Sequence, residues 1–168
     1  MWMLFSVASA GPNVLELTYK VDFDLDAMGD KLCGLTKFCD CSSVYAGRGT
    51  IVEAAPDRVT FRGTWTIGEN SCQDPLKVWV PADGVAFHTL WVTDGKVTAW
   101  VVSDEVSNAK PRKQAIKENK QFWIDELAIP WPTKRFEATQ QDAGDMGMGI
   151  TLTATHHLLG AVTGADAK

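Results

Sequence analysis

Apolar and polar residues alternate with a period of two over long stretches of this chain, and that pattern limits what it can fold into. The clearest run starts at Leu15, from which every second residue up to Leu25 is apolar while the residues between are polar. Similar runs lie at 58–67 and 150–158. Because successive side chains of a strand point to opposite faces of a sheet, each run predicts a strand with one buried and one solvated face.

A tight turn in the middle of the chain predicts a hairpin over 85–104. Asp94-Gly95 divides this apolar segment, and Asp-Gly is a favoured two-residue hairpin turn. A two-residue loop would place Trp91 opposite Thr98. One face of the hairpin would then carry Phe87, Trp91, Trp100 and Val102, and the other His88, Leu90, Val92, Val97, Ala99 and Val101. Both faces are apolar, so we expect the hairpin to be covered on both sides.

Three further elements follow from local signals. Ala55-Pro56-Asp57 predicts a second hairpin joining 44–54 to 58–67, and 76–80 reads as a short strand. Apolar residues at helical spacing predict one helix over 111–127, with Pro111 in its first turn and prolines beyond its end.

About eight strands with one late helix predict a mainly β fold, an antiparallel β-barrel in a single domain over 1–159 with a frayed tail at 160–168. A two-sheet β-sandwich is the alternative. We favour the barrel because long strands would otherwise leave exposed edges. Gly63-Thr64-Trp65 resembles the Gly-x-Trp of lipocalins, which lies near their first strand. Here it lies well past the first predicted strand and assigns no family.

Net charge and hydropathy argue against several classes of partner and location. Sixteen basic and 21 acidic residues give a net charge of −5, which argues against nucleic acid and anionic membranes. No apolar run reaches the ~20 residues of a spanning helix. Ala8-Ser9-Ala10 fits a signal cleavage site, but no basic region precedes it, and a first strand is the favoured interpretation.

The four cysteines leave the compartment open. They are Cys33, Cys39, Cys41 and Cys72. Two disulfides, reduced thiols and, at a spacing unusual for zinc, a metal site all fit this set. Reduced thiols are slightly favoured, and with them the cytoplasm over an exported location.

An acidic run does not predict a metal site. Asp22, Asp24 and Asp26 resemble the start of a calcium loop, but Ala27 and Cys33 stand where such a loop needs Gly and Glu. On a strand the three carboxylates share the solvated face. We expect no metal and no cofactor.

Candidate acid–base residues come from the buried faces. His156 lies on the apolar face of 150–158, and Tyr19 on that of the first run. A histidine facing the interior near neutral pH is the usual general acid or base, so His156 and Tyr19 are the predicted catalytic pair. His88 is a weaker candidate, and Arg48, between two glycines, is the best candidate to receive an anionic group.

The tryptophans suggest a ligand site. Trp65, Trp91 and Trp100, with Phe87 and His88, would line an apolar cavity typical of small-molecule sites. The first hypothesis is therefore a barrel that binds a hydrophobic or aromatic small molecule. If the protein is an enzyme, an open question here, it would catalyse isomerisation, cyclisation or a lyase reaction. The alternative is a sandwich that binds carbohydrate or protein through an exposed aromatic face. A homodimer that buries the two-sided hairpin is a third hypothesis.

Overall fold

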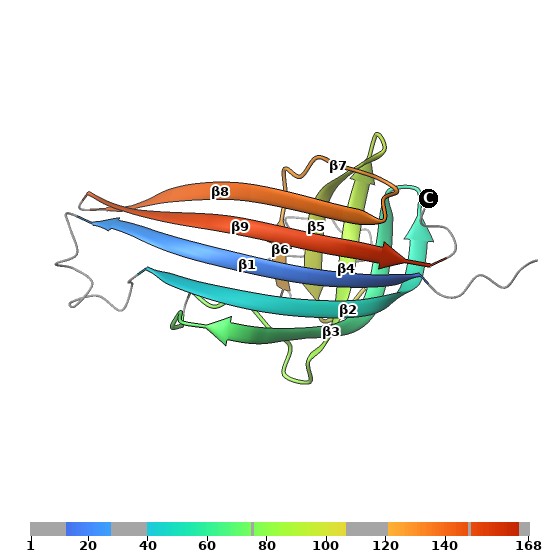
Figure 1. The fold of residues 1–168 in the computed structure, drawn as a ribbon, viewed down its shortest axis with the longest axis horizontal. Helices are drawn as coiled ribbons and strands as arrows, with labels where there is room; N and C mark the ends of the chain where they lie inside the picture. The colour runs from blue at the N-terminus through green and yellow to red at the C-terminus, as the bar shows by residue number, and fades with distance from the viewer. Residues whose placement is uncertain (1–12, 28–39, 75, 107–120, 148, 165–168) are drawn as a thin grey trace, which may run out of the picture.

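The computed structural model describes residues 13–27, 40–74, 76–106, 121–147 and 149–164 (Figure 1). Strands make up 74% of these residues, and none of the described residues is helical. The fold is mainly β, as the alternation predicts. In the described part of the chain there is thus no helix that could cross a membrane.

Nine strands form one antiparallel sheet that curls into a half-barrel (Figure 1). The strands are β1 (Val14–Ala27), β2 (Cys41–Ala55), β3 (Arg58–Asn70), β4 (Val85–Thr93), β5 (Lys96–Ser103), β6 (Gln121–Ile124), β7 (Ile129–Pro130), β8 (Arg135–Gly147) and β9 (Ile150–Thr163). Their order is β6-β5-β4-β3-β2-β1-β9-β8, and β7 pairs with β5. Among the described residues no pairing joins β8 to β6 or β7, so the predicted closure of the barrel is not formed there.

Both predicted hairpins are present, but the register of the hairpin at 85–104 differs from the prediction. Thr93 pairs with Lys96 as expected, whereas Trp91 pairs with Ala99 instead of Thr98. A bulge after Trp91 inserts one extra residue on β5. Because side chains alternate, this shift moves Trp100 to the face opposite that of Trp91.

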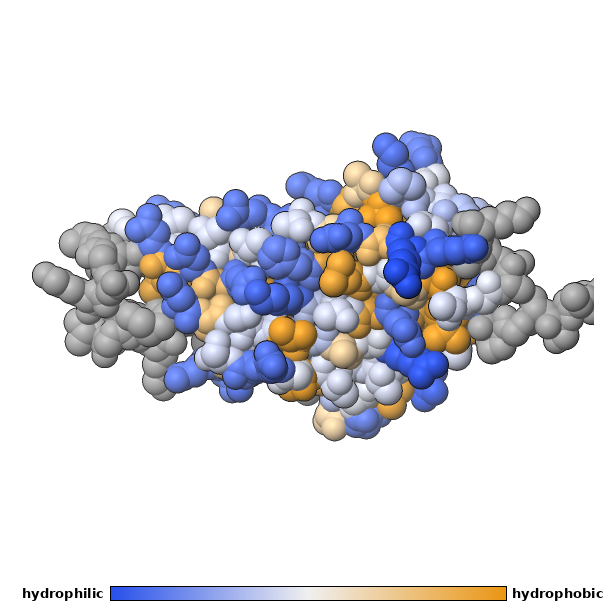
Figure 2. Space-filling model, viewed as in Figure 1, coloured by the Kyte–Doolittle hydropathy of each residue, from blue (hydrophilic) through white to orange (hydrophobic). Residues whose placement is uncertain are grey.

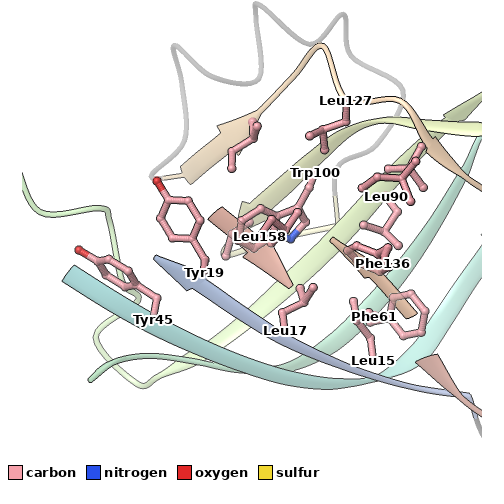
Figure 3. Close-up of a cluster of buried hydrophobic side chains, with 14 of the residues drawn as sticks. Leu15, Leu17, Tyr19, Tyr45, Phe61, Leu90, Trp100, Leu127, Phe136 and Leu158 are labelled. Atoms are coloured by element: carbon pink, nitrogen blue, oxygen red, sulfur yellow. The ribbon is translucent and has the colours of Figure 1, made fainter. Parts of the chain in front are cut away.

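The core lies on the concave face of the half-barrel (Figure 3). Its largest fully buried side chains are Trp65, Trp100, Tyr19, Tyr45, Phe61, Leu15, Leu90 and Leu158. One close approach of strands requires glycine. A Cβ on Gly63 would lie 1.7 Å from the backbone oxygen of Arg48, so β3 can approach β2 here only without a side chain.

The predicted strand at 76–80 is not formed. This segment follows β3 as irregular chain that packs on the core through Val78, Trp79 and Val80. Side chains replace the bonds of a strand ladder here. Tyr45 Oη accepts a hydrogen bond from the Val78 amide at 2.8 Å, and Trp65 Nε1 donates to the Trp79 carbonyl at 3.0 Å.

The predicted late helix is also wrong where the structure describes it. Gln121–Ile124 forms β6, in which Phe122 and Ile124 point inward opposite Val102 and Trp100 of β5. Two inward residues at a spacing of two suit a strand, and pairing with β5 satisfies the backbone. Residues 107–120 lie outside the described residues.

The ends of the chain and the cysteines give three further outcomes. The last strand continues to Thr163, past the tail predicted from Gly160. Cys41 and Cys72 form a disulfide, which is one of the alternatives the sequence left open. Cys33 and Cys39, like the N-terminal segment 1–12, lie outside the described residues.

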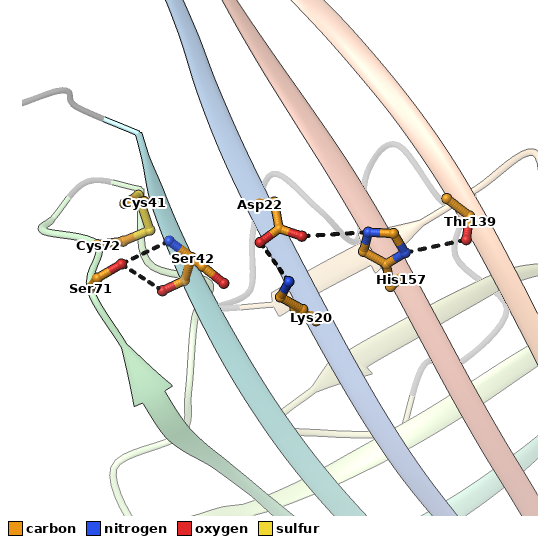
Figure 4. A network of polar contacts seen from close by, with 8 residues as sticks. All are labelled: Lys20, Asp22, Cys41, Ser42, Ser71, Cys72, Thr139 and His157. Carbon is orange, nitrogen blue, oxygen red and sulfur yellow. Dashed lines mark hydrogen bonds and ion pairs between the residues drawn. A yellow bond between two sulfur atoms is a disulfide. The ribbon is translucent and has the colours of Figure 1, made fainter.

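The outer face of β1 is solvated, as predicted. Figure 2 shows hydrophilic residues over much of the face that β8, β9, β1 and β2 present. On it Asp22 binds Lys20 at 2.9 Å and His157 Nε2 at 3.5 Å, while Thr139 contacts the other ring nitrogen of His157 (Figure 4). Asp24 and Asp26 are exposed, and no group of metal-binding side chains gathers anywhere in the described residues.

Candidate functional site

The structure brings the two predicted catalytic residues together. Tyr19 on β1 and His156 on the neighbouring strand β9 both point inward, and the Tyr19 Oη–His156 Nδ1 distance is 2.7 Å. The rings are nearly parallel, with centroids 6.0 Å apart. Alternation on two adjacent strands therefore suffices to place both groups in one site.

A third residue, Asp142 on β8, completes a chain of polar contacts that we call the relay (Tyr19, His156 and Asp142). Asp142 Oδ2 lies 3.2 Å from His156 Nε2. A carboxylate only accepts hydrogen bonds, so a neutral His156 carries its proton on Nε2 and accepts at Nδ1. Tyr19 is then the donor to Nδ1. The contacts thus assign both the tautomer and the direction of each bond.

Burial and charge set the proton affinities of the relay. Burial raises the pKa of Tyr19, and the nearby Tyr45 and Asp142 raise it further, so its phenol stays protonated. Burial also lowers the pKa of His156, against the opposing effect of Asp142. The His156 side chain is 14% exposed and that of Asp142 65%, so the relay runs from the solvent into the core.

Aromatic rings surround Tyr19. Its ring centroid lies 4.9 Å from that of Phe122, 5.7 Å from Trp100 and 5.8 Å from Tyr45. Trp65 packs against Tyr45 and, edge to face, against Trp100. These rings exclude water from the buried end of the relay, which strengthens its polar contacts.

Beyond the relay, the same face of β1 and β9 carries apolar side chains that remain only half-buried. We call this set the inner strip: Phe23, Leu25, Leu152 and Ala154. Phe23 pairs with Ala154 and Leu25 with Leu152, so the four form one surface. Val21, which pairs with His156, connects the inner strip to the relay. An apolar surface thus ends directly at a titratable group.

His88 points into the core but does not join the relay. Its Nε2 donates to the Thr64 carbonyl at 2.9 Å, and Gly47 leaves the space that its ring occupies. Burial lowers the pKa of His88 to about 4, only partly offset by that hydrogen bond. The imidazole is therefore neutral near pH 7, and its buried Nδ1 has no hydrogen-bond partner among the described residues.

The remaining predicted ligand residues do not line a common cavity. Trp65 and Trp100 are fully buried and fill the interior. Trp91 and Phe87 lie on the other face of β4, where Arg58 stacks on the Trp91 ring at 5.3 Å. Arg48 is exposed and pairs with Glu16. With Trp100 buried, the two hairpin tryptophans do not form the exposed face that the alternative function requires.

Asp142, Phe122 and Tyr45 are site residues that sequence analysis missed. Asp142 lies in the distal part of β8, where burial does not alternate and every residue is exposed. Phe122 falls within the helix predicted over 111–127. Tyr45 lies at a period-two position of the 44–54 segment, and that spacing was the available signal.

The site gains no support from relatives. Comparison with protein-family models, with curated proteins and with solved structures finds no match. What the site can do therefore follows from its geometry alone, a general acid or base poised between a carboxylate and a phenol beside an apolar surface.

We expect the Asp142→Asn variant to have a His156 pKa further below its usual value than in the wild type. The Asp142 charge raises that pKa against the effect of burial, and the amide removes it. NMR titration of the imidazole signals measures the change. Asp24→Asn, the same substitution on the outer face of β1, should leave the His156 titration unchanged. Equal titration curves in both variants would contradict the relay.

Proposed function

We propose that the protein binds an apolar or aromatic small molecule on the inner strip and places a polar group of that molecule against His156 and Asp142. The observation that carries this proposal is the position of the relay at the end of the inner strip. Small-molecule sites combine an apolar surface with a few placed polar groups. The binding surface thus differs from the Trp-lined cavity that the sequence predicts.

The relay supports proton transfer as the reaction. His156 is the general acid or base. Its Nε2 already carries a proton, so it takes up a proton at Nδ1, where the polar group of the bound molecule replaces the Tyr19 hydroxyl, and Asp142 stabilises the imidazolium that forms. Tyr19, whose phenol stays protonated, holds the ring in one tautomer. A group that removes a proton from a bound molecule and returns it elsewhere serves isomerisation, cyclisation or lyase chemistry.

An oxidising compartment is the second part of the proposal. The Cys41–Cys72 disulfide supports it, because disulfides persist in exported proteins and are rare in the cytoplasm. The sequence alone slightly favours the cytoplasm, whereas the disulfide favours an exported location.

Binding of the apolar fluorophore 1-anilinonaphthalene-8-sulfonate tests the proposed surface. We expect Leu152→Gln, in the inner strip, to weaken binding roughly tenfold, because an amide replaces an apolar contact. Leu159→Gln is the matched control, since Leu159 is exposed on the outer face of the same strand. Circular dichroism confirms that both variants fold. Equal affinity in the two variants would place the binding surface elsewhere.

A further inference from the structure

One edge of β8 is free in the described part of the structure. One edge pairs with β9 over most of the 13-residue strand, and no strand among the described residues pairs with the other. The Lys134 carbonyl accepts the Val162 amide, so the even-numbered residues of β8 bond to β9. The odd-numbered residues from Arg135 to Asp145 therefore direct their N–H and C=O groups to the free edge. Such an edge is a template for another strand.

The two halves of this edge differ in their surroundings. The first half, 135–140, borders a groove of about 490 Å³ whose other wall is formed by 126–130 and Thr133. The second half extends past β6 and β7 (Figure 1). One half thus offers space beside it, and the other is free to enter such a space.

We propose that two copies of the chain pair through β8, antiparallel, about a twofold axis at Gln140. The projecting half of each strand would enter the groove beside the first half of the other. The two curled sheets would then be continuous across the dimer.

Charge selects this register. With the axis at Gln140, Arg135 of each copy lies opposite Asp145 of the other, and Glu137 lies opposite Ala143. Odd residues face odd residues, as the backbone bonds require. Arg135 is exposed and has no ion pair in the described structure, so it is available to the second copy.

The neighbouring registers are less favourable. Moving the axis to Gln141 places Glu137 opposite Asp145, and directly opposed like charges destabilise a strand pair. Moving it to Thr139 places Arg135 opposite Ala143 and leaves Asp145 beyond the paired strands. Of these three axes, only the one at Gln140 forms two ion pairs without a repulsive one.

The side chains on the inner face of the paired strands are also compatible with an axis at Gln140. Gln140 would lie opposite its own copy in a non-hydrogen-bonded pair, where side chains approach most closely. Its amide oxygen is buried and has no partner within the described chain. Ala138 of the second copy would lie opposite Asp142, so the dimer would cover the exposed end of the relay.

Sedimentation equilibrium across a dilution series tests the pairing. We expect the wild type to reach twice the mass of the 18.4 kDa chain. Arg135→Asp should raise the dissociation constant roughly tenfold, because two attractive pairs become repulsive. Combining Arg135→Asp with Asp145→Arg should restore it. Asp24→Arg is the control, because it changes the charge by the same amount at an exposed side chain on the outer face of β1. It should leave the dissociation constant unchanged.

A backbone variant provides an independent measurement. Ala143→Pro removes one N–H that faces the free edge and none that bonds to β9, and proline is tolerated on such edges. It should weaken the dimer while circular dichroism stays unchanged. A monomeric wild type at every concentration, or a dimer that neither Arg135→Asp nor Ala143→Pro weakens, would overturn the proposal. The mass measurement involves no ligand, so its outcome is independent of the proposed function.

Discussion

Replacing Trp65 with alanine is expected to lower the free energy of unfolding by about 4 kcal/mol. The side chain is fully buried, and its ring centroid lies 5.4 Å from those of both Tyr45 and Trp100. The variant also loses the hydrogen bond to the Trp79 carbonyl, which holds the irregular segment after β3 against the core. Urea unfolding followed by circular dichroism measures the loss.

Trp91→Ala is the matched control for this experiment. The same atoms are removed, but Trp91 is half-buried on the other face of the hairpin, where the Arg58 guanidinium lies over its ring. The expected cost is about 1 kcal/mol. A similar loss in both variants would mean that Trp65 and Trp91 share one environment, as the Trp-lined cavity predicted from the sequence requires.

Trp91 and Trp100, which the shifted register places on opposite faces, show why the sequence predicts the hairpin but not its register. Asp94-Gly95 specifies the turn, and both central residues have the positive φ that such a turn needs. Beyond it, both faces of the hairpin are apolar, so a shift by one residue exposes nothing polar to the core. The bulge after Trp91 therefore leaves no signal in the hydropathy pattern.

The candidate site is likewise predictable from the sequence only in part. Tyr19 and His156 lie on strands with one buried and one solvated face, so the alternation of apolar and polar residues is enough to direct both side chains inward. Asp142 lies in the half of β8 that extends past β6 and β7, where no face of the strand is buried. Apolar and polar residues do not alternate there, so the sequence pattern does not predict where Asp142 points. Whether Trp65 and Trp100 line a cavity or fill it depends on how tightly the sheet curls, a property of the whole fold that residue pattern does not encode.

The double variant Cys41→Ser/Cys72→Ser should lower the free energy of unfolding by about 3 to 4 kcal/mol. The disulfide joins residues 31 apart in the sequence, at the end of the β2–β3 hairpin that is distant from its turn. Without it the unfolded chain gains conformational freedom that the folded chain does not. Urea unfolding of the variant and the wild type measures the difference.

Ser71→Ala is the control for the disulfide, because it changes the adjacent residue and leaves both sulfur atoms in place. It removes only the hydroxyl contacts with the Ser42 backbone (Figure 4), at an expected cost of about 1 kcal/mol. Non-reducing peptide mapping of the wild type should recover the segments around Cys41 and Cys72 as one linked product. Unlinked peptides, with equal stability of the double variant and the wild type, would remove the support for an oxidising compartment. The hairpin would then be held by its backbone hydrogen bonds and by the packing of Tyr45, Phe61 and Trp65 in the core.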